Sequence, residues 1–416
     1  MSEIFDISLR DEGLRRILWA ERHMPILGKI RHRFEQEQAF EGIRISLAVH
    51  LEAKTACLVR AFRRGGAEVY VTGSNPQSTQ DAICAALVAD GCEVNAIHGA
   101  SFERYREFWK KTLSLKPHIV IDDGADLINL LMGECSDFAG HLIGACEETT
   151  SGVQRLRAWE KEGRLAFPAV AVNDAECKTW FDNYYGTGQS TVGAIMRATN
   201  LMISGMKIVV AGYGWVGRGI ARMAAGLGAR IIVTEIDPIA GLKAVMDGFT
   251  VMEMDEAAAL GDLFVTATAS IDVITPRHFE KMKHGAILCN AGHFDREIDL
   301  LSLEAMAVKV ETVRENITAY TLKDGREIHV IAHGALVNIA AADGHPVEIM
   351  DISFSLQALS AEYLTQHRSI PAGVHAVPES IDRMVADIKL ETMGIALDQE
   401  TEAQKEYRQK DLIVRQ

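Results

Sequence analysis

The sequence predicts an α/β protein made of two doubly wound domains, each built on a parallel sheet, and a short C-terminal tail. Three observations favour this fold class. The chain has 416 residues, more than one ordinary domain. Short apolar segments alternate with helical patterns along its first half. A glycine-rich turn at 211–217 then joins an apolar segment to a helical pattern, which indicates a second domain of the same kind.

The elements are expected in the following order. The first domain has predicted strands at 43–49, 68–72, 93–97, 119–121 and 169–172, with helices at 55–64, 80–90 and 102–111. The second has predicted strands at 206–210, 230–233, 264–266, 286–289, 307–312 and 327–331, with a helix at 218–227. Helices at 349–363 and 379–393 follow, and then a polar tail from 399.

The turn Ala-Gly-Tyr-Gly-Trp-Val-Gly contains Gly212, Gly214 and Gly217 in GxGxxG spacing between a predicted strand and a predicted helix. In this context the motif is typical of Rossmann-like domains, where the helix N-terminus faces a pyrophosphate. Glu235 lies 18 residues after Gly217, at the end of the next strand. Because a carboxylate accepts from ribose hydroxyls and repels a 2′-phosphate, we predict NAD and not NADP as the cofactor.

Composition and charge exclude several other classes of protein. The net charge of −14 disfavours a nucleic-acid surface, which needs clustered Lys and Arg. No stretch approaches 18 uncharged apolar residues and the N-terminus has no signal-peptide pattern, so we expect a cytoplasmic protein without membrane contact. The seven cysteines form no metal-binding spacing and are expected to be reduced core residues.

Polar side chains stand where several predicted strands end. His50, Asp122, Asp123 and Asn173 are of this kind. Ligands of open α/β sheets bind outside the carboxyl ends of the strands, so these residues are candidates for a small-molecule site. A lone histidine after a strand is more often a satisfied core residue, and that alternative stays open for His50.

The chain resembles the S-adenosyl-L-homocysteine hydrolase family over nearly its whole length. The resemblance rests on ordered motifs at 74–81, 122–124, 147–150, 181–186, 211–217, 234–238, 290–294, 336–338 and 344–346. It implies reversible hydrolysis of S-adenosyl-L-homocysteine to adenosine and L-homocysteine. The implied route oxidises the ribose 3′-hydroxyl with NAD, removes the acidified C4′ proton, eliminates homocysteine, adds water and returns the hydride.

The resemblance also implies domains and roles. The expected domains are a substrate-binding domain at 1–182, an NAD-binding domain at 183–345, a return to the substrate domain at 346–385 and a tail at 386–416. A homo-oligomer, a tetramer in the family, is expected. The implied catalytic residues are His50, Asp123, Lys178, Asp182 and His293; substrate would be bound by Glu52, Lys54, Thr55, Glu148, Asn173, Asn338 and His345; and NAD by Thr149, Thr150, Ser151, Asn183, Gly212, Gly214, Trp215, Val216, Gly217, Glu235, Asn290, Gly292 and Asn338.

Some of these residues have simpler interpretations. Lys178 could equally be a solvated helix lysine, and as a base it would need burial or a cationic neighbour to lower its pKa. Glu147 is expected to be an exposed carboxylate at a helix start, and the hydroxyl of Ser151 could be a helix cap. We expect no metal.

The sequence departs from the family at three places. Thr187 stands where many relatives have a cysteine, so no thiol is essential there. The last residues, 410–416, differ from the Lys- and Tyr-containing tail that reaches a neighbouring subunit's NAD in many relatives. At the purine edge, Glu52 and Lys54 replace the common pattern.

Glu52 can only accept and Lys54 can only donate, which complements hypoxanthine better than adenine. S-inosyl-L-homocysteine is therefore an alternative substrate, unless the two side chains simply pair with each other. A 2-hydroxyacid dehydrogenase would explain the glycine turn but not Lys178 with Asp182, and an inactive NAD-binding relative would not need His50 and Asp123 as well.

Overall fold

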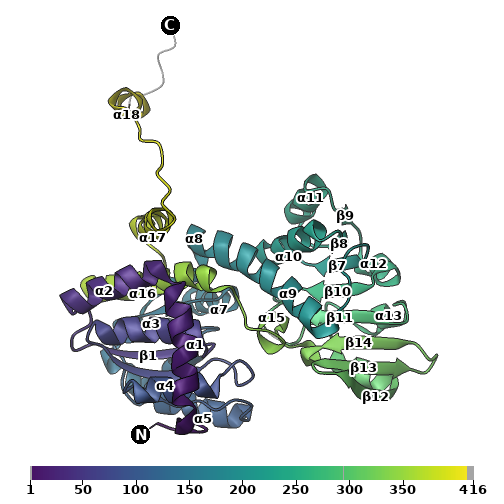
Figure 1. Ribbon diagram of the computed structural model, residues 1–416, viewed down its shortest axis with the longest axis horizontal. Coiled ribbons are helices and arrows are strands. Elements are labelled where there is room, and N and C mark those ends of the chain that lie inside the picture. Colours follow the sequence, from purple (N-terminus) through teal and green to yellow (C-terminus); the bar gives the residue numbers. More distant parts are fainter. Residues whose placement is uncertain (1, 294, 410–416) are drawn as a thin grey trace.

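Two sheets form the framework of the molecule. The computed structural model describes residues 2–293 and 295–409, and Figure 1 shows the sheets side by side, joined by the helical segment around α8 and α9. The fold class predicted from the sequence is confirmed. Within the described residues, no helix is both long enough and apolar enough to span a membrane.

The first sheet has the order β15-β6-β5-β4-β1-β2-β3, and all its strands are parallel. From β1 the chain winds first to β3 and then back across to β4, so the switch point lies between β1 and β4. Its strands are β1 (Arg44–Val49), β2 (Glu68–Gly73), β3 (Glu93–Val94), β4 (Ile119–Asp122), β5 (Gly144–Glu147), β6 (Pro168–Ala171) and β15 (Gly373–Ala376).

Helices cover both faces of this sheet because the apolar side chains of a strand alternate between them. On β1, Leu47 packs in the core beneath α2, α3, α4 and α16, whereas Ala48 packs beneath α5, α6 and α7. The helices are α1 (Arg10–Arg22), α2 (Pro25–Glu37), α3 (Ala53–Arg64), α4 (Asp81–Ala89), α5 (Phe102–Leu113), α6 (Asp126–Met132), α7 (Thr150–Lys161), α16 (Val347–Gln366) and α17 (Glu379–Thr392).

The second sheet has the order β12-β13-β14-β11-β10-β7-β8-β9. The strands from β14 to β9 are parallel and have the winding of a dinucleotide-binding domain, and β12 and β13 add an antiparallel edge. The strands are β7 (Lys207–Ala211), β8 (Arg230–Thr234), β9 (Thr250–Val251), β10 (Leu263–Thr266), β11 (Ala286–Asn290), β12 (Ala307–Arg314), β13 (Ile317–Leu322) and β14 (Glu327–Ile331).

The helices of the second sheet also divide between its faces. Val210 of β7 packs with α9 and α10, and its neighbour Val209 packs with α12 and α13. These helices are α9 (Thr187–Thr199), α10 (Trp215–Gly226), α11 (Pro238–Met246), α12 (Met254–Leu260), α13 (Pro276–Phe279), α14 (Leu300–Met306) and α15 (Val337–Ala340).

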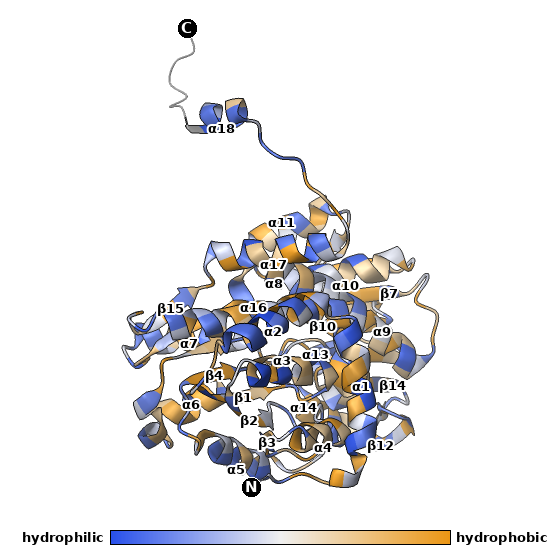
Figure 2. Ribbon diagram, turned by 60° about the vertical axis from the view of Figure 1, so that its left-hand side comes forward, coloured by the Kyte–Doolittle hydropathy of each residue, from blue (hydrophilic) through white to orange (hydrophobic). Residues whose placement is uncertain are grey.

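The chain crosses between the sheets twice. The first crossing is a continuous helical segment formed by α8 (Glu176–Lys178), a π-helix at Thr179–Gly186 and α9. The second is the loop between α15 and α16. The domain boundary proposed at 182/183 falls within the π-helix, and the one at 385/386 falls within α17. The helix α18 (Glu402–Gln409) stands apart from both sheets and is largely hydrophilic (Figure 2).

Several elements differ from those predicted. Strand β3 ends at Val94 and not at 97, because Asn95 forms a bridge with Glu3 instead. Helix α10 begins at Trp215, three residues before the predicted start, because the helix opens directly from the glycine turn. Strands β5, β9, β13 and β15 were not predicted, and neither were helices α1, α2, α6 to α9, α11 to α15 and α18. All seven cysteines are buried and unpaired, as expected.

The packing of α1 against α4 gives a stability prediction. A Cβ on Gly13 would lie 1.8 Å from the carbonyl oxygen of Ala82, whereas one on Gly28 of α2 would meet nothing within 4 Å. We expect Gly13→Ala to lower the free energy of unfolding by about 1–3 kcal/mol through overpacking. Gly28→Ala should raise it by about 0.5–1 kcal/mol, because alanine favours a helix.

Denaturant unfolding of the two variants beside the parent protein measures both effects. Equal stability of the two variants would contradict the close approach of α1 and α4.

Candidate active site

A cavity of about 1100 Å³ lies between the two sheets, and side chains from both line it. It opens above the carboxyl ends of β1 and β4 and reaches the glycine turn after β7. Of the predicted site residues, all but Asp122, Gly217 and Asn290 line this cavity. Asp122 is buried beside it and accepts from the backbone N–H groups of Asp123 (3.1 Å) and Ile128 (2.9 Å). Residues from opposite ends of the chain therefore share one space.

The three glycines of the turn have separate functions. Gly212 has a φ of +93°, and a Cβ there would lie 2.6 Å from the carbonyl oxygen of Ala267. A Cβ on Gly217 would lie 1.9 Å from the Gly212 carbonyl oxygen, so this position allows helix and strand to pack. Gly214 has no atom within 4 Å of a Cβ position, which leaves open space at the start of α10 for a phosphate.

Glu235 lies at the other edge of this space. Its carboxylate accepts from the backbone N–H of Tyr213 (2.6 Å), and from those of Ile236 (2.6 Å) and Asp237 (3.0 Å). These bonds hold the carboxylate beside the glycine turn, in the place where a ribose hydroxyl donor is expected. The residues of this part of the cavity thus fit an adenosine diphosphate group of NAD.

The remaining predicted cofactor residues form a polar wall. Thr149 caps α7, where its hydroxyl accepts from Gly152 N at 3.0 Å, and the hydroxyl of Thr150 donates to Asn173 Oδ1 at 3.2 Å. The helix-cap alternative was stated for Ser151, but the residue that caps α7 is Thr149, and the Ser151 hydroxyl lies 3.2 Å from the Thr149 hydroxyl. Asn290 accepts from Gly292 N at 2.7 Å and shapes the loop behind the cavity.

Lys178 is buried at the centre of the site. Its Nζ donates to Asp182 Oδ1 and Asn183 Oδ1, both at 2.7 Å, and lies 3.6 Å from Glu148 Oε1. Only 4% of the residue is exposed, so it is not a solvated helix lysine. Two carboxylates from different elements thus face one buried ammonium.

The charges around Lys178 reverse the expected pKa shift. Burial alone would lower the pKa of Lys178, but Asp182 and Glu148 outweigh it and raise the pKa above its usual value. Burial would likewise raise the pKa of Asp182, yet Lys178 and His345 lower it. Burial raises the pKa of Glu148 to about 7 despite Lys178. In this geometry Lys178 is a charged hydrogen-bond donor. Its pKa is not lowered, as it would have to be for Lys178 to act as a base.

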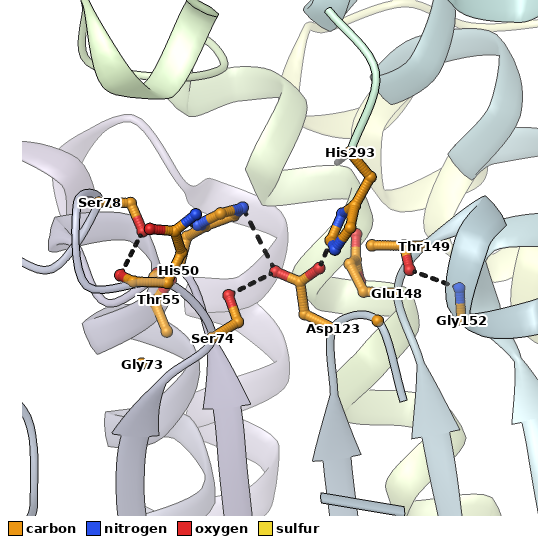
Figure 3. A network of polar contacts seen from close by, with 12 residues as sticks. His50, Thr55, Gly73, Ser74, Ser78, Asp123, Glu148, Thr149, Gly152 and His293 are labelled. Atoms are coloured by element: carbon orange, nitrogen blue, oxygen red, sulfur yellow. Dashed lines mark hydrogen bonds and ion pairs between the residues drawn. The ribbon is translucent and has the colours of Figure 1, made fainter. Parts of the chain in front are cut away.

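A second group surrounds Asp123, which follows β4. His50 Nε2 lies 3.5 Å from Asp123 Oδ2, and His293 Nδ1 lies 4.0 Å from Oδ1. Figure 3 shows the two histidines on different sides of this carboxylate. The hydroxyl of Ser74 donates to Oδ2 at 3.0 Å, and His50 Nδ1 lies 2.6 Å from Ser78 Oγ. Burial lowers the pKa of His50, although Asp123 opposes the shift.

The expected purine end lies at the start of α3. Lys54 Nζ is 3.1 Å from Glu52 Oε2 and donates to the carbonyl oxygen of Asp343 at 3.0 Å. The two side chains therefore pair with each other here, which was the simpler interpretation. Thr55 donates to the His50 carbonyl oxygen at 2.5 Å.

Thr187 occupies the position of the family cysteine. Its hydroxyl lies 2.9 Å from His345 Nε2, on the second crossing between the sheets. Burial lowers the pKa of His345 to about 4, so the ring is neutral near pH 7. At the position where many relatives have a cysteine, this chain therefore has a hydroxyl that hydrogen-bonds to His345.

Three buried oxygen atoms of the site have no hydrogen-bond partner within residues 2–293 and 295–409. They are Asp123 Oδ1, Glu148 Oε1 and Asn338 Oδ1. A buried acceptor without a partner is costly, so each is a place where a ligand donor would be stabilising. Ribose hydroxyls and a nicotinamide amide carry such donors.

Other residues of the site were missed or misjudged. Glu147 is fully buried and not exposed, because its carboxylate accepts from Gly124 N (2.8 Å), Ala125 N (2.9 Å) and Thr149 N (2.9 Å). Gln357 and Ser353, whose side chains reach Glu148 and Asp182, were not singled out at all. Two adjacent glutamates directly after the short apolar segment at 142–146 were the only available signal for Glu147.

Comparisons with known proteins match both parts of the chain to one family. Residues 2–139 match the family model "S-adenosyl-L-homocysteine hydrolase", and residues 183–344 match its "NAD binding domain". The chain is 54% identical to the adenosylhomocysteinase of Pyrococcus abyssi over 97% of this chain and 96% of that protein. It is 52% identical to the S-inosyl-L-homocysteine hydrolase of Methanocaldococcus jannaschii over 98% of each chain. Overall sequence identity therefore does not distinguish an adenine-containing substrate from a hypoxanthine-containing one.

The raised pKa of Glu148 predicts a pH dependence of stability. A carboxyl whose folded pKa is about 7, above its usual 4.5, stabilises the fold in its protonated form. This contribution is present below pH 4.5 and is lost as the pH rises through 7. We expect Glu148→Gln to flatten the fall in melting temperature of the NAD-free protein across this interval.

Glu162→Gln, which changes an exposed carboxyl at the end of α7, is the control and should leave the slope as in the parent protein. A Glu148→Gln slope equal to that of the parent would contradict the raised pKa.

Proposed function

The chain belongs to the S-adenosyl-L-homocysteine hydrolase family, and from that premise we propose that it hydrolyses S-adenosyl-L-homocysteine reversibly to adenosine and L-homocysteine. One observation carries the proposal. The glycine turn, the Lys178 cluster and the Asp123 group, which a redox step and later proton transfers require, all face the same cavity. The protein is a hydrolase with an NAD-binding domain.

We propose that the glycine turn and Glu235 hold the adenosine half of NAD. Thr149, Thr150 and Asn338, with Ser151, Asn183 and the His293 loop, would hold the nicotinamide half. When bound, NAD supplies reversible oxidation of the ribose 3′ carbon. Asn338 supports this assignment, because it lines the cavity and its buried Oδ1 atom has no hydrogen-bond donor among the described residues.

Lys178 and Asp182 are proposed to bind the 3′-hydroxyl, and Glu148 the neighbouring hydroxyl. Lys178 is an ammonium when Asp182 lies 2.7 Å away. A neutral hydroxyl that entered between these side chains would weaken their attraction and so lower the pKa of Lys178. Lys178 could then take the hydroxyl proton as the 3′ carbon is oxidised.

Asp123 and His50 are proposed to move protons at C4′, C5′ and the leaving sulfur. Asp123 Oδ1 is buried without a hydrogen-bond partner in the described part of the chain, and both histidines approach this carboxylate. His50 is held by Ser78 at Nδ1, so its Nε2 is directed toward Asp123. Asn173 orients Asn183, which donates to its Oδ1 at 3.1 Å.

A second candidate substrate is S-inosyl-L-homocysteine. Glu52 and Lys54 line the cavity at the expected purine end, and a carboxylate with an ammonium matches N1–H and O6 of hypoxanthine. Lys54 Nζ donates to the Asp343 carbonyl oxygen and lies 3.1 Å from Glu52 Oε2, and an ammonium carries three N–H groups, so the side chain retains donor capacity for a purine base. His345 is proposed to contact the purine from the second crossing.

We also propose a cytoplasmic homo-oligomer, a tetramer as in the family. Exposed apolar side chains of α11 that do not line the cavity support an interface: Leu242, Val245 and Met246 are exposed by 62%, 52% and 82%. The departure of the chain end from the family pattern, at 410–416, lies outside the described residues. The domain boundaries at 182, 345 and 385 remain proposals as well.

Two variants separate oxidation from the later steps. Lys178→Ala should retain NAD but show little reduction of it on addition of nucleoside, because the proton acceptor is gone. Asp123→Asn should permit reduction yet turn over at least about 100-fold more slowly, since its role follows oxidation. The absorbance of reduced nicotinamide and the release of homocysteine measure the two steps. Rapid reduction in Lys178→Ala would exclude Lys178 as the oxidation base.

Condensation of homocysteine with adenosine or with inosine identifies the base. We expect adenosine to react, and the wrong base to be rejected strongly because it would leave buried polar groups unpaired. Lys54→Met tests the second candidate: if Lys54 binds O6, the variant loses inosine condensation selectively, and if Lys54 serves only Glu52 and Asp343, both rates change alike. Condensation of inosine with none of adenosine would replace the proposed substrate.

A further inference from the structure

Helix α16 presents buried polar side chains to the active site. Ser353 and Gln357 are both fully buried, and their spacing of four residues places them on one face of the helix. The Ser353 hydroxyl donates to Asp182 Oδ2 at 2.8 Å, and the Gln357 amide donates to Glu148 Oε2 at 2.6 Å. One face of α16 thus contacts both carboxylates that face Lys178.

Asp182 and Glu148 each use one carboxylate oxygen to contact α16 and the other to face Lys178. Asp182 gives Oδ2 to Ser353 and Oδ1 to Lys178. Glu148 gives Oε2 to Gln357, while Oε1 lies 3.6 Å from Lys178 and has no hydrogen-bond partner within the described part of the chain. Each carboxylate is therefore anchored to α16 by one oxygen and directed toward the ammonium by the other.

We propose that Ser353 and Gln357 are positioning residues, which act through Asp182 and Glu148 to hold Lys178 in its place for ribose oxidation. The inference rests on the proposed function, which assigns that step to Lys178. Neither residue is proposed to touch the reacting atoms. α16 follows the second crossing, so this support comes from the segment of chain that returns from the NAD-binding sheet.

The donor chemistry gives Gln357 an electrostatic effect as well as a geometric one. An amide N–H can only donate, so its bond favours the ionised carboxylate of Glu148 and lowers the pKa of that group. Lys178 lowers it too, whereas burial and the charges of Asp182 and Asp123 raise it. Removal of the Gln357 donor would therefore let Glu148 take up a proton at higher pH, and a neutral Glu148 holds the ammonium less firmly.

The experiment measures the rate of reduction of bound NAD, across a range of pH, after adenosine is added to the full-length enzyme. Gln357→Met keeps the length of the side chain but removes its donor. We expect the pH at which the rate falls on the acid side to rise by about one unit. Ser353→Ala should slow reduction, and Ser353→Thr, which retains the hydroxyl, should restore it.

Ser355→Ala is the matched control. Ser355 lies on the same helix, is equally buried, and its hydroxyl has no hydrogen-bond partner among the described residues. Its profile should coincide with that of the parent enzyme. A second comparison uses Glu148→Gln, in which the carboxyl is absent. If Gln357 acts through Glu148, the shift caused by Gln357→Met disappears in this background.

The outcomes are distinct. A Gln357→Met profile that matches the parent, a shift that persists in Glu148→Gln, or an equal shift in Ser355→Ala would each overturn the positioning role while the parent enzyme still reduces its NAD. If the parent enzyme reduces no bound NAD with adenosine or with inosine, the proposed function fails and this inference fails with it.

Discussion

The need to pair one buried ammonium organises the active site. Lys178 lies almost wholly out of water, where an uncompensated charge would cost several kcal/mol, so its neighbours must supply opposite charge and hydrogen bonds. Asp182 comes from the same helical segment, one turn away, and Glu148 comes from the end of β5. The pairing therefore ties the first crossing between the sheets to the carboxyl end of β5, an interior strand of the first sheet.

The loops around this ion pair depend on a second buried carboxyl. Glu147 accepts from the backbone of the loop after β4, which carries Asp123, and of the loop after β5, which carries Thr149. A Cβ on Gly152 would lie 2.2 Å from its carboxyl, so there is no room for any larger residue there. The burial of Glu147 raises its pKa well above the usual value. Glu147 is therefore a buried ionisable residue that holds the loops of the site in place.

The two sheets contribute to the cavity in different ways. The second sheet supplies a space shaped mainly by backbone, because its glycine turn leaves room beside Gly214 and packs tightly at Gly217. The first sheet supplies ionisable side chains at the strand ends on either side of its switch point, with His50 after β1 and Asp123 after β4. This division is consistent with the proposal that the second sheet holds the adenosine half of NAD and that the first sheet supplies most of the ionisable groups.

The sequence by itself determined the fold class, the cofactor turn and the strand-end candidates His50, Asp123 and Asn173, because these depend on local signals. The family resemblance supplied most of the other predicted residues that line the cavity. Alternating patterns marked most of the parallel strands, and the spacing of Gly212, Gly214 and Gly217 after a strand specified a turn that the structure contains. His50 and Asp123 could be placed together because the carboxyl ends of parallel strands share one edge.

The tertiary structure alone decided the electrostatics and the supporting contacts. Gln357 and Glu148 are 209 residues apart, and Ser353 and Asp182 are 171 residues apart, so no periodicity or motif links them. The direction of the Lys178 pKa shift depended on whether burial or two carboxylates prevailed, which is a matter of distances in space. Glu147 appeared exposed for the same reason: its donors come from a loop that only folding brings to it.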